Sequence, residues 1–102
     1  MSDPIKVITR FIRQRCGGLA DLSVERGDSD RWQSLLFDGG RHHIALRLDG
    51  DRVEEAIGLL RDEAAAPDLI IPGHLLVDIS ITGVDRSLGG ALVRLEALTI
   101  VH

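Results

Sequence analysis

The histidines are the residues of this chain best suited to acid–base chemistry or metal binding. Imidazole titrates near neutral pH and is a common metal ligand. His42, His43 and His74 fall at the ends of predicted strands, and Asp38 and Asp78 are acids placed in or beside the same strands. These five residues are the candidate catalytic set.

Spacing limits what these histidines do together. His42 and His43 are neighbours in a predicted strand, so they point to opposite faces and only one of them can serve a given site. His74 reaches that site only if the two strand ends are neighbours in the sheet. The pattern matches no metal-ligand motif, and the competing interpretation is surface histidines at turn edges. We therefore predict no metal and no cofactor.

Other catalytic motifs are missing from the sequence. Lys6 is the only lysine and no two glycines stand two residues apart, so there is neither a Walker A loop nor a GxGxxG turn. The lone Cys16 forms no internal disulfide and is expected in the core. Residues 83–90 offer backbone N–H groups and Arg86 to an anion, but a long hairpin connection is the simpler interpretation.

A basic stripe runs along the first predicted helix. Lys6, Arg10 and Arg13 stand at helical spacing in a stretch, residues 4–20, that contains no acid. They are candidates for contacting phosphates or the acids of a partner. The alternative is that they complement residues 49–63, which hold six acids. The net charge of −4 argues against a nucleic-acid partner.

The first half of the chain predicts one helix and three strands. Apolar residues recur at helical spacing over residues 4–16, after an Asp-Pro start and before two glycines. Alternating runs at 22–24, 32–37 and 44–48 predict three strands. Glycine and aspartate at 27–30 and 38–40 supply the turns between these strands.

The second half predicts one helix and two strands. Asp51, with Glu54 three residues later, is typical of a capped helix start, and Pro67 ends that helix. Residues 75–82 and 92–101 alternate as strands, and Pro72-Gly73 suits the centre of a type II turn.

These elements predict an α+β fold of order α-β-β-β-α-β-β. Two helices would cover one face of a mostly antiparallel five-stranded sheet in a two-layer sandwich. A length of 102 residues with 44% hydrophobic and 27% charged residues suits a single domain, 1–102. No apolar run approaches the roughly 20 residues that cross a bilayer, and no secretory leader is recognisable. We expect a cytoplasmic protein, and the excess of arginine over lysine indicates a bacterial one.

Alternation also places apolar residues on the outer face of the sheet, the face that the helices leave uncovered. A contiguous apolar patch there is typical of an interaction surface, although a bulge that switches parity would hide some of its members. The prolines at 67 and 72 bracket a second apolar segment. The interface candidates are Leu35, Phe37, Leu76, Leu98 and Ile100 on the strands, and Leu69, Ile70 and Ile71 in that segment.

The sequence therefore favours a non-catalytic interaction module that self-associates as a homodimer and is open to a further protein partner. The contact would use the outer sheet face, or strand addition along residues 91–101. The alternative is a small metal- or ligand-binding enzyme that uses histidines at strand ends. A third role is anion contact through the basic first helix.

Overall fold

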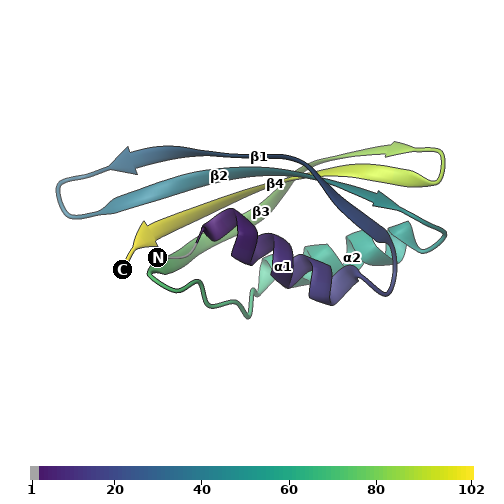
Figure 1. The fold of residues 1–102 in the computed structure, drawn as a ribbon, viewed down its shortest axis with the longest axis horizontal. Helices are drawn as coiled ribbons and strands as arrows, with labels where there is room; N and C mark the ends of the chain where they lie inside the picture. The colour runs from purple at the N-terminus through teal and green to yellow at the C-terminus, as the bar shows by residue number, and fades with distance from the viewer. Residues whose placement is uncertain (1–2) are drawn as a thin grey trace.

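The computed structural model describes residues 3–102 as two helices packed against one face of a four-stranded sheet (Figure 1). The elements are α1 (Pro4–Cys16), β1 (Asp21–Gln33), β2 (Asp38–Asp49), α2 (Val53–Ala65), β3 (His74–Ser87) and β4 (Gly90–Val101). The strand order is β1-β2-β4-β3, and every neighbouring pair is antiparallel. The α+β class with two helices is confirmed, whereas the sheet has four strands and not the predicted five.

The missing strand is explained by β1, which is one continuous strand of 13 residues where the sequence predicted two strands and a turn. Its polar middle, residues 27–30, stays extended because each residue pairs with β2 in an unbroken register. The chain reverses instead at 34–37, where the Ser34 N–H donates to the Phe37 carbonyl at 2.8 Å. Long-range strand pairing thus overrides the local turn composition.

The predicted turn at 38–40 is likewise part of a strand, the start of β2. Its glycines are needed for packing and not for a turn. A Cβ at Gly39 would collide with the Trp32 ring on β1 and with the Thr99 carbonyl on β4, and one at Gly40 would lie 2.7 Å from the His42 ring. Both glycines therefore let neighbouring side chains lie flat on the sheet.

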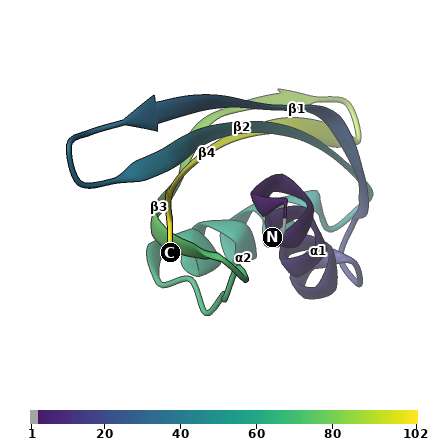
Figure 2. The ribbon, with the colours of Figure 1, turned by 60° about the vertical axis from the view of Figure 1, so that its left-hand side comes forward.

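The core lies between the inner sheet face and the helices. Ile44, Leu46 and Leu48 alternate along β2 as buried residues, and Ile12 and Leu60 come from the helices to meet that face. The sheet arches over both helices, and the β1–β2 hairpin extends beyond them (Figure 2). Part of the concave face under that hairpin is therefore left without a helix to cover it.

The two helices start in different ways. Asp3 caps α1 by accepting the Ile5 N–H at 3.0 Å, as the sequence predicts. The N-cap of α2 is Arg52, directly before Val53, and its side chain makes no capping bond. The predicted cap at Asp51 is therefore wrong. Glu54, the expected second half of that cap, is instead held by Arg86 of β3 at 2.8 and 2.9 Å.

Bulges decide which face some β3 residues occupy. The register of β3 against β4 shifts between Leu76 and Asp78, and again between Ile81 and Gly83. The first shift turns Leu76 inward, where it packs against the core. Its predicted place on the outer face is therefore wrong, because the bulge switches the parity of the strand.

The position of β4 corrects the predicted strand addition. β4 lies between β2 and β3 and pairs with both along its length, so residues 91–101 offer no free edge to another chain. The edges of the sheet are β1 and β3. Within residues 3–102, neither helix is long and apolar enough to cross a membrane.

The element order also divides the chain into two similar halves. Each half is one helix followed by one antiparallel hairpin, α1-β1-β2 and α2-β3-β4, and the halves join through β2 and β4 at the centre of the sheet. Both halves contribute buried residues to the one core cluster.

Candidate functional site

The structure divides the candidate histidines between the two faces of the sheet. His42 is buried on the inner face of β2, whereas its neighbour His43 lies on the outer face, with its Nε2 atom 3.5 Å from Asp30. Asp78 pairs with Leu98 on that outer face, so it lies on the opposite side of the sheet from His42. The five candidates therefore do not form one site.

Three of them do meet in a hollow under the overhanging β1–β2 hairpin. Its volume is about 480 Å³, and His42, His74 and Asp38 line it together with Pro4 at the start of α1. Ser29, Arg31 and Thr99 complete most of its polar wall. The sequence left open whether the start of β3 lies near His42 on β2. Only β4 runs between these two strands, so both reach the same hollow.

His42 is held between two hydroxyl groups from neighbouring strands. Its Nδ1 atom lies 2.6 Å from the Ser29 hydroxyl on β1, and its Nε2 atom 2.8 Å from the Thr99 hydroxyl on β4. Burial, and secondly the charge of nearby His74, lower the pKa of His42. A neutral imidazole then donates through one nitrogen and accepts through the other, which satisfies the buried ring.

This arrangement is a weak basis for catalysis. Ser29 and His42 have the spacing of a nucleophile and its base, but a threonine, and not a carboxylate, holds the second nitrogen. The lowered pKa also makes His42 a poorer base at neutral pH. Among the residues described, no group of three or more His, Cys, Asp or Glu side chains is placed to hold a metal ion.

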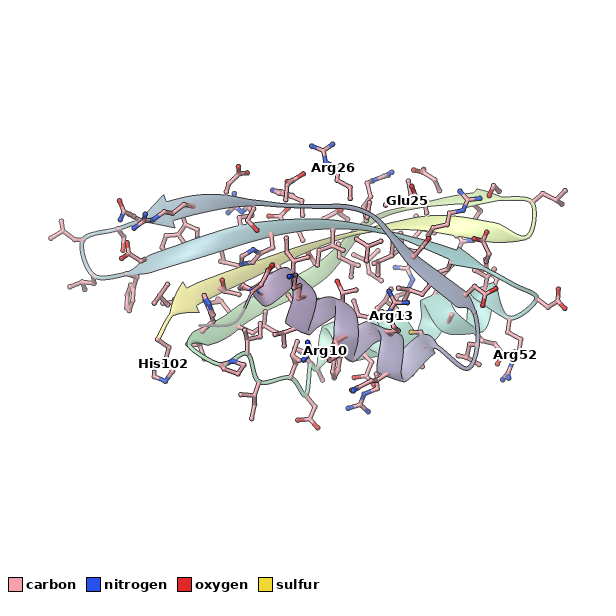
Figure 3. All side chains as sticks on the ribbon, in the orientation of Figure 1. Arg10, Arg13, Glu25, Arg26, Arg52 and His102 are labelled. Atoms are coloured by element: carbon pink, nitrogen blue, oxygen red, sulfur yellow. The ribbon has the colours of Figure 1, made fainter. Side chains whose placement is uncertain are left out.

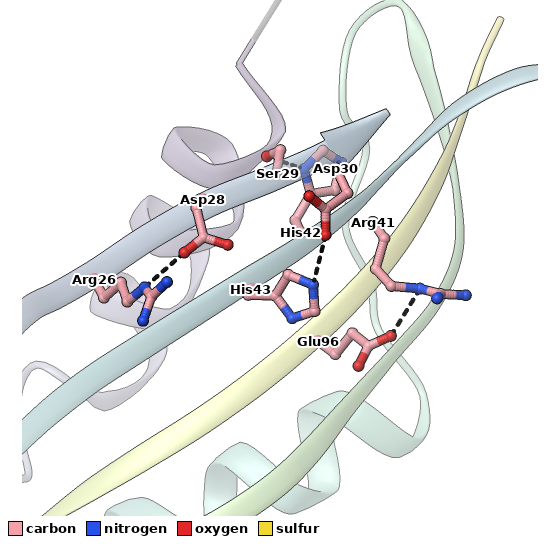
Figure 4. Close-up of polar contacts among 8 residues, drawn as sticks. All are labelled: Arg26, Asp28, Ser29, Asp30, Arg41, His42, His43 and Glu96. Carbon is pink, nitrogen blue, oxygen red and sulfur yellow. Dashed lines mark hydrogen bonds and ion pairs between the residues drawn. The ribbon is translucent and has the colours of Figure 1, made fainter. Parts of the chain in front are cut away.

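The outer sheet face carries charges that are mostly paired with one another (Figure 4). Arg26 contacts Asp28 at 2.6 Å on β1, and Arg41 contacts Glu96 at 2.9 Å across β2 and β4. Arg94 binds Asp85. Because each cation already has an acid beside it, this face is poorly suited to hold a free anion.

One end of the outer face is apolar. The register places Trp32, Gly39, Ile100 and Leu75 in one row across all four strands. Just beyond that row is the hairpin tip, whose Leu35, Leu36 and Phe37 side chains are 102%, 82% and 51% exposed. We call this surface the apolar end; its members are Trp32, Leu35, Leu36, Phe37, Leu75, Leu98 and Ile100.

Part of the apolar end was predictable from the sequence. Alternation places Leu35, Phe37, Leu98 and Ile100 on the outer face, but strict alternation over 32–37 turns Leu36 inward. Residues 34–37 lie beyond the end of β1 at Gln33, so alternation no longer applies to them. Three consecutive apolar residues next to a hairpin reversal were the signal that could have identified Leu36.

The segment between the prolines contributes little to the outer surface. Ile71 is 2% exposed and Leu69 packs against the core, so neither offers a surface to a partner. Ile70 is exposed, and it lines a shallow hollow with Leu75 of the apolar end. It is the one interface candidate of this segment that lies at the surface.

The basic stripe of α1 is exposed but partly used within the chain. Arg13 donates to the Leu22 carbonyl at 2.9 Å and so ties α1 to the start of β1. Lys6 and Arg10 are exposed, and Figure 3 shows Arg10 and Arg13 on the helix surface. The ion pair between α1 and α2 is made by Arg15, whose guanidinium lies 3.8 Å from the Glu63 carboxylate.

The fold and its surfaces define a small two-layer α+β protein with an uncovered sheet face and an apolar hairpin tip. A scan against protein-family models found no match, and searches of the curated proteins and of the solved structures found no significant match either.

Proposed function

We propose that this protein is a non-catalytic interaction module of the cytoplasm that self-associates through its apolar end. The observation that supports the proposal is the run of large apolar side chains at the tip of the overhanging hairpin, Leu35 to Phe37, next to the apolar row across the sheet. Burying one such side chain contributes roughly 1.5–3 kcal/mol. Exposed clusters of this kind mark interaction surfaces.

A second copy of the chain suits the border of this surface. The border carries both signs of charge, with Arg41 beside Glu96. A two-fold axis through such a border can place the cation of one copy against the acid of the other. The single buried thiol of Cys16 fits a reducing compartment such as the cytoplasm.

Sedimentation velocity over a range of concentrations tests the proposal. The wild-type chain is expected to associate, and Leu35→Ser with Leu36→Ser is expected to raise the dissociation constant by at least about tenfold. Leu98→Thr with Ile100→Thr should act in the same direction. The matched control is Leu88→Ser, at the tip of the other hairpin, where an equally exposed leucine lies far from the apolar end.

Two results contradict this proposal. A wild-type chain that stays monomeric at every concentration removes self-association altogether. An association that is equally strong in wild type and in the Leu35→Ser, Leu36→Ser variant assigns the contact to another surface.

A second candidate function is supported by the hollow that brings His42, His74 and Asp38 together. In this alternative the protein binds a small ligand under the β1–β2 hairpin. Native mass spectrometry of protein purified without chelator gives the test, because a retained metal or metabolite adds mass to the chain. A spectrum of unliganded chains would favour the interaction module over the ligand binder.

A further inference from the structure

We infer that the free edge of β1 pairs with β1 of a second copy, antiparallel and centred on Asp28. This inference rests on the self-association proposed above but uses a different surface, the backbone edge of the sheet.

The two edge strands differ in how well they can accept another strand. β3 is interrupted by two register shifts, which bend a strand and interrupt its pairing. β1 has one shift, between Val24 and Arg26, followed by regular pairing over all eight residues from 26 to 33. Part of this stretch lies in the hairpin that extends beyond the helices (Figure 2). β1 is therefore the edge that is open to strand addition.

The charges along β1 are complementary to themselves when the strand is reversed. Counting outward from Asp28, Gly27 corresponds to Ser29 and Arg26 to Asp30. In an antiparallel pair centred on Asp28, residues at equal distances from the centre lie opposite each other. Arg26 of each copy then faces Asp30 of the other. The symmetry produces this contact twice.

Neighbouring registers are less favourable. Arg26, Asp28 and Asp30 share the outer face, so the register can shift only in steps that keep outer residues opposite outer residues. Centring on Ser29 puts Asp28 opposite Asp30 twice, which is repulsive. Centring on Gly27 leaves only residues 26–28 regular in both copies, because the bulge at Glu25 intervenes. Centring on Asp28 keeps residues 26–30 regular in both copies.

The one unfavourable contact of the chosen register is Asp28 opposite Asp28. In each copy the Arg26 Nε atom lies 2.6 Å from an Asp28 carboxylate oxygen, which offsets this repulsion (Figure 4). The terminal nitrogens of Arg26 remain able to bind the acid of the second copy. Charged edges normally discourage strand pairing. In β1, the order of positive and negative side chains permits pairing with β1 of a second copy and discourages pairing with strands of a different charge order.

Charge reversal tests this register. Arg26→Asp puts an acid opposite Asp30 at both symmetric positions, and Asp30→Arg puts two cations together. Each single variant is expected to raise the dissociation constant measured by sedimentation at least about tenfold. The double variant Arg26→Asp, Asp30→Arg should return it to near the wild-type value. Asp78→Arg, on the outer face of the other edge strand, is the matched control and should change nothing.

Mixing the two single variants gives a sharper result. The acids of the Arg26→Asp chain face the arginines of the Asp30→Arg chain, so a mixed pair should form although each variant alone associates poorly. A folding defect does not produce this rescue, and circular dichroism checks that each variant is folded. Failure of both the mixture and the double variant to associate overturns the edge pairing.

The two surfaces are separable by these variants. If the leucine substitutions at 35 and 36 abolish association while the charge reversals have no effect, the edge pairing is wrong and the apolar end remains the contact. If the charge reversals act and the leucine substitutions do not, the apolar end is wrong and the edge pairing remains. A wild-type chain that is monomeric at every concentration overturns both.

Discussion

Replacing Thr99 with valine is expected to destabilise the protein, because it removes the hydroxyl that satisfies a buried nitrogen of His42. Valine keeps the shape of threonine, so the packing of β4 should hardly change. The loss is confined to the contact of 2.8 Å between the Thr99 hydroxyl and His42 Nε2. Thr99 is 1% exposed and His42 5%, so water reaches this contact poorly.

The size of the effect follows from that burial. Leaving a buried polar group without its partner costs about 1–3 kcal/mol, more than the net value of an exposed hydrogen bond. We expect Thr99→Val to lower the free energy of unfolding by about that amount. Thr82→Val is the matched control, because the exposed Thr82 hydroxyl donates to the Arg94 carbonyl at 3.3 Å and water can replace that acceptor. The control should stay within about 0.5 kcal/mol of wild type.

Urea unfolding at pH 7.5 measures both variants, with the fluorescence of Trp32 and far-ultraviolet circular dichroism as independent signals. All chains are compared at one concentration, so that any self-association contributes equally. Ser29→Ala, alone and combined with Thr99→Val, completes a double-mutant cycle across His42. If Thr99→Val unfolds at the same urea concentration as Thr82→Val, the hydroxyl chain through His42 does not stabilise the fold.

Further predictions concern pH and packing. Burial lowers the pKa of His42 in the folded chain, so the unfolded chain takes up the proton first as the pH falls. The free energy of unfolding should therefore decrease below about pH 6.5, by at most about 1.4 kcal/mol per pH unit. Urea titrations at several pH values should show a smaller slope in His42→Gln. Gly39→Ala should lower stability by about 1–3 kcal/mol because its Cβ meets Trp32 and backbone, whereas Gly58→Ala, in open space on α2, should raise it by up to about 1 kcal/mol. Thermal melts of the two glycine variants should therefore move in opposite directions. Leu46→Ala, fully buried on β2, should cost about 2–5 kcal/mol in urea unfolding.

The helices and the last two strands were predictable because their signals are local. The Asp3 cap and the apolar spacing up to Cys16 define α1, and alternation indicates β4 and the first part of β3, although β3 continues to Ser87, beyond its predicted end at residue 82. β1 was not predictable in the same way, because residues 27–30 have the composition of a turn and are kept extended by pairing with β2. Nothing in the local sequence reports that pairing.

The candidate site was predictable only in part, for a similar reason. Alternation separates His42 from His43, but only the strand order brings His74 and Asp38 into the hollow with His42. The inward turn of Leu76 depends on a bulge at the next residue, which alternation cannot foresee. The hydroxyl partners of His42 come from β1 and β4, so they too required the sheet order.

The division into two helix-and-hairpin halves has a consequence for how the chain can be cut. Each helix is followed by its own hairpin, and the chain passes between the halves once, at residues 50–52 between β2 and α2. A break there would leave two complementary fragments, each with an apolar sheet face and an unpaired central strand. Co-expressed, they should reassemble along the seam of β2 and β4, so this short connection is the natural point for a split-protein reporter or for a circularly permuted chain.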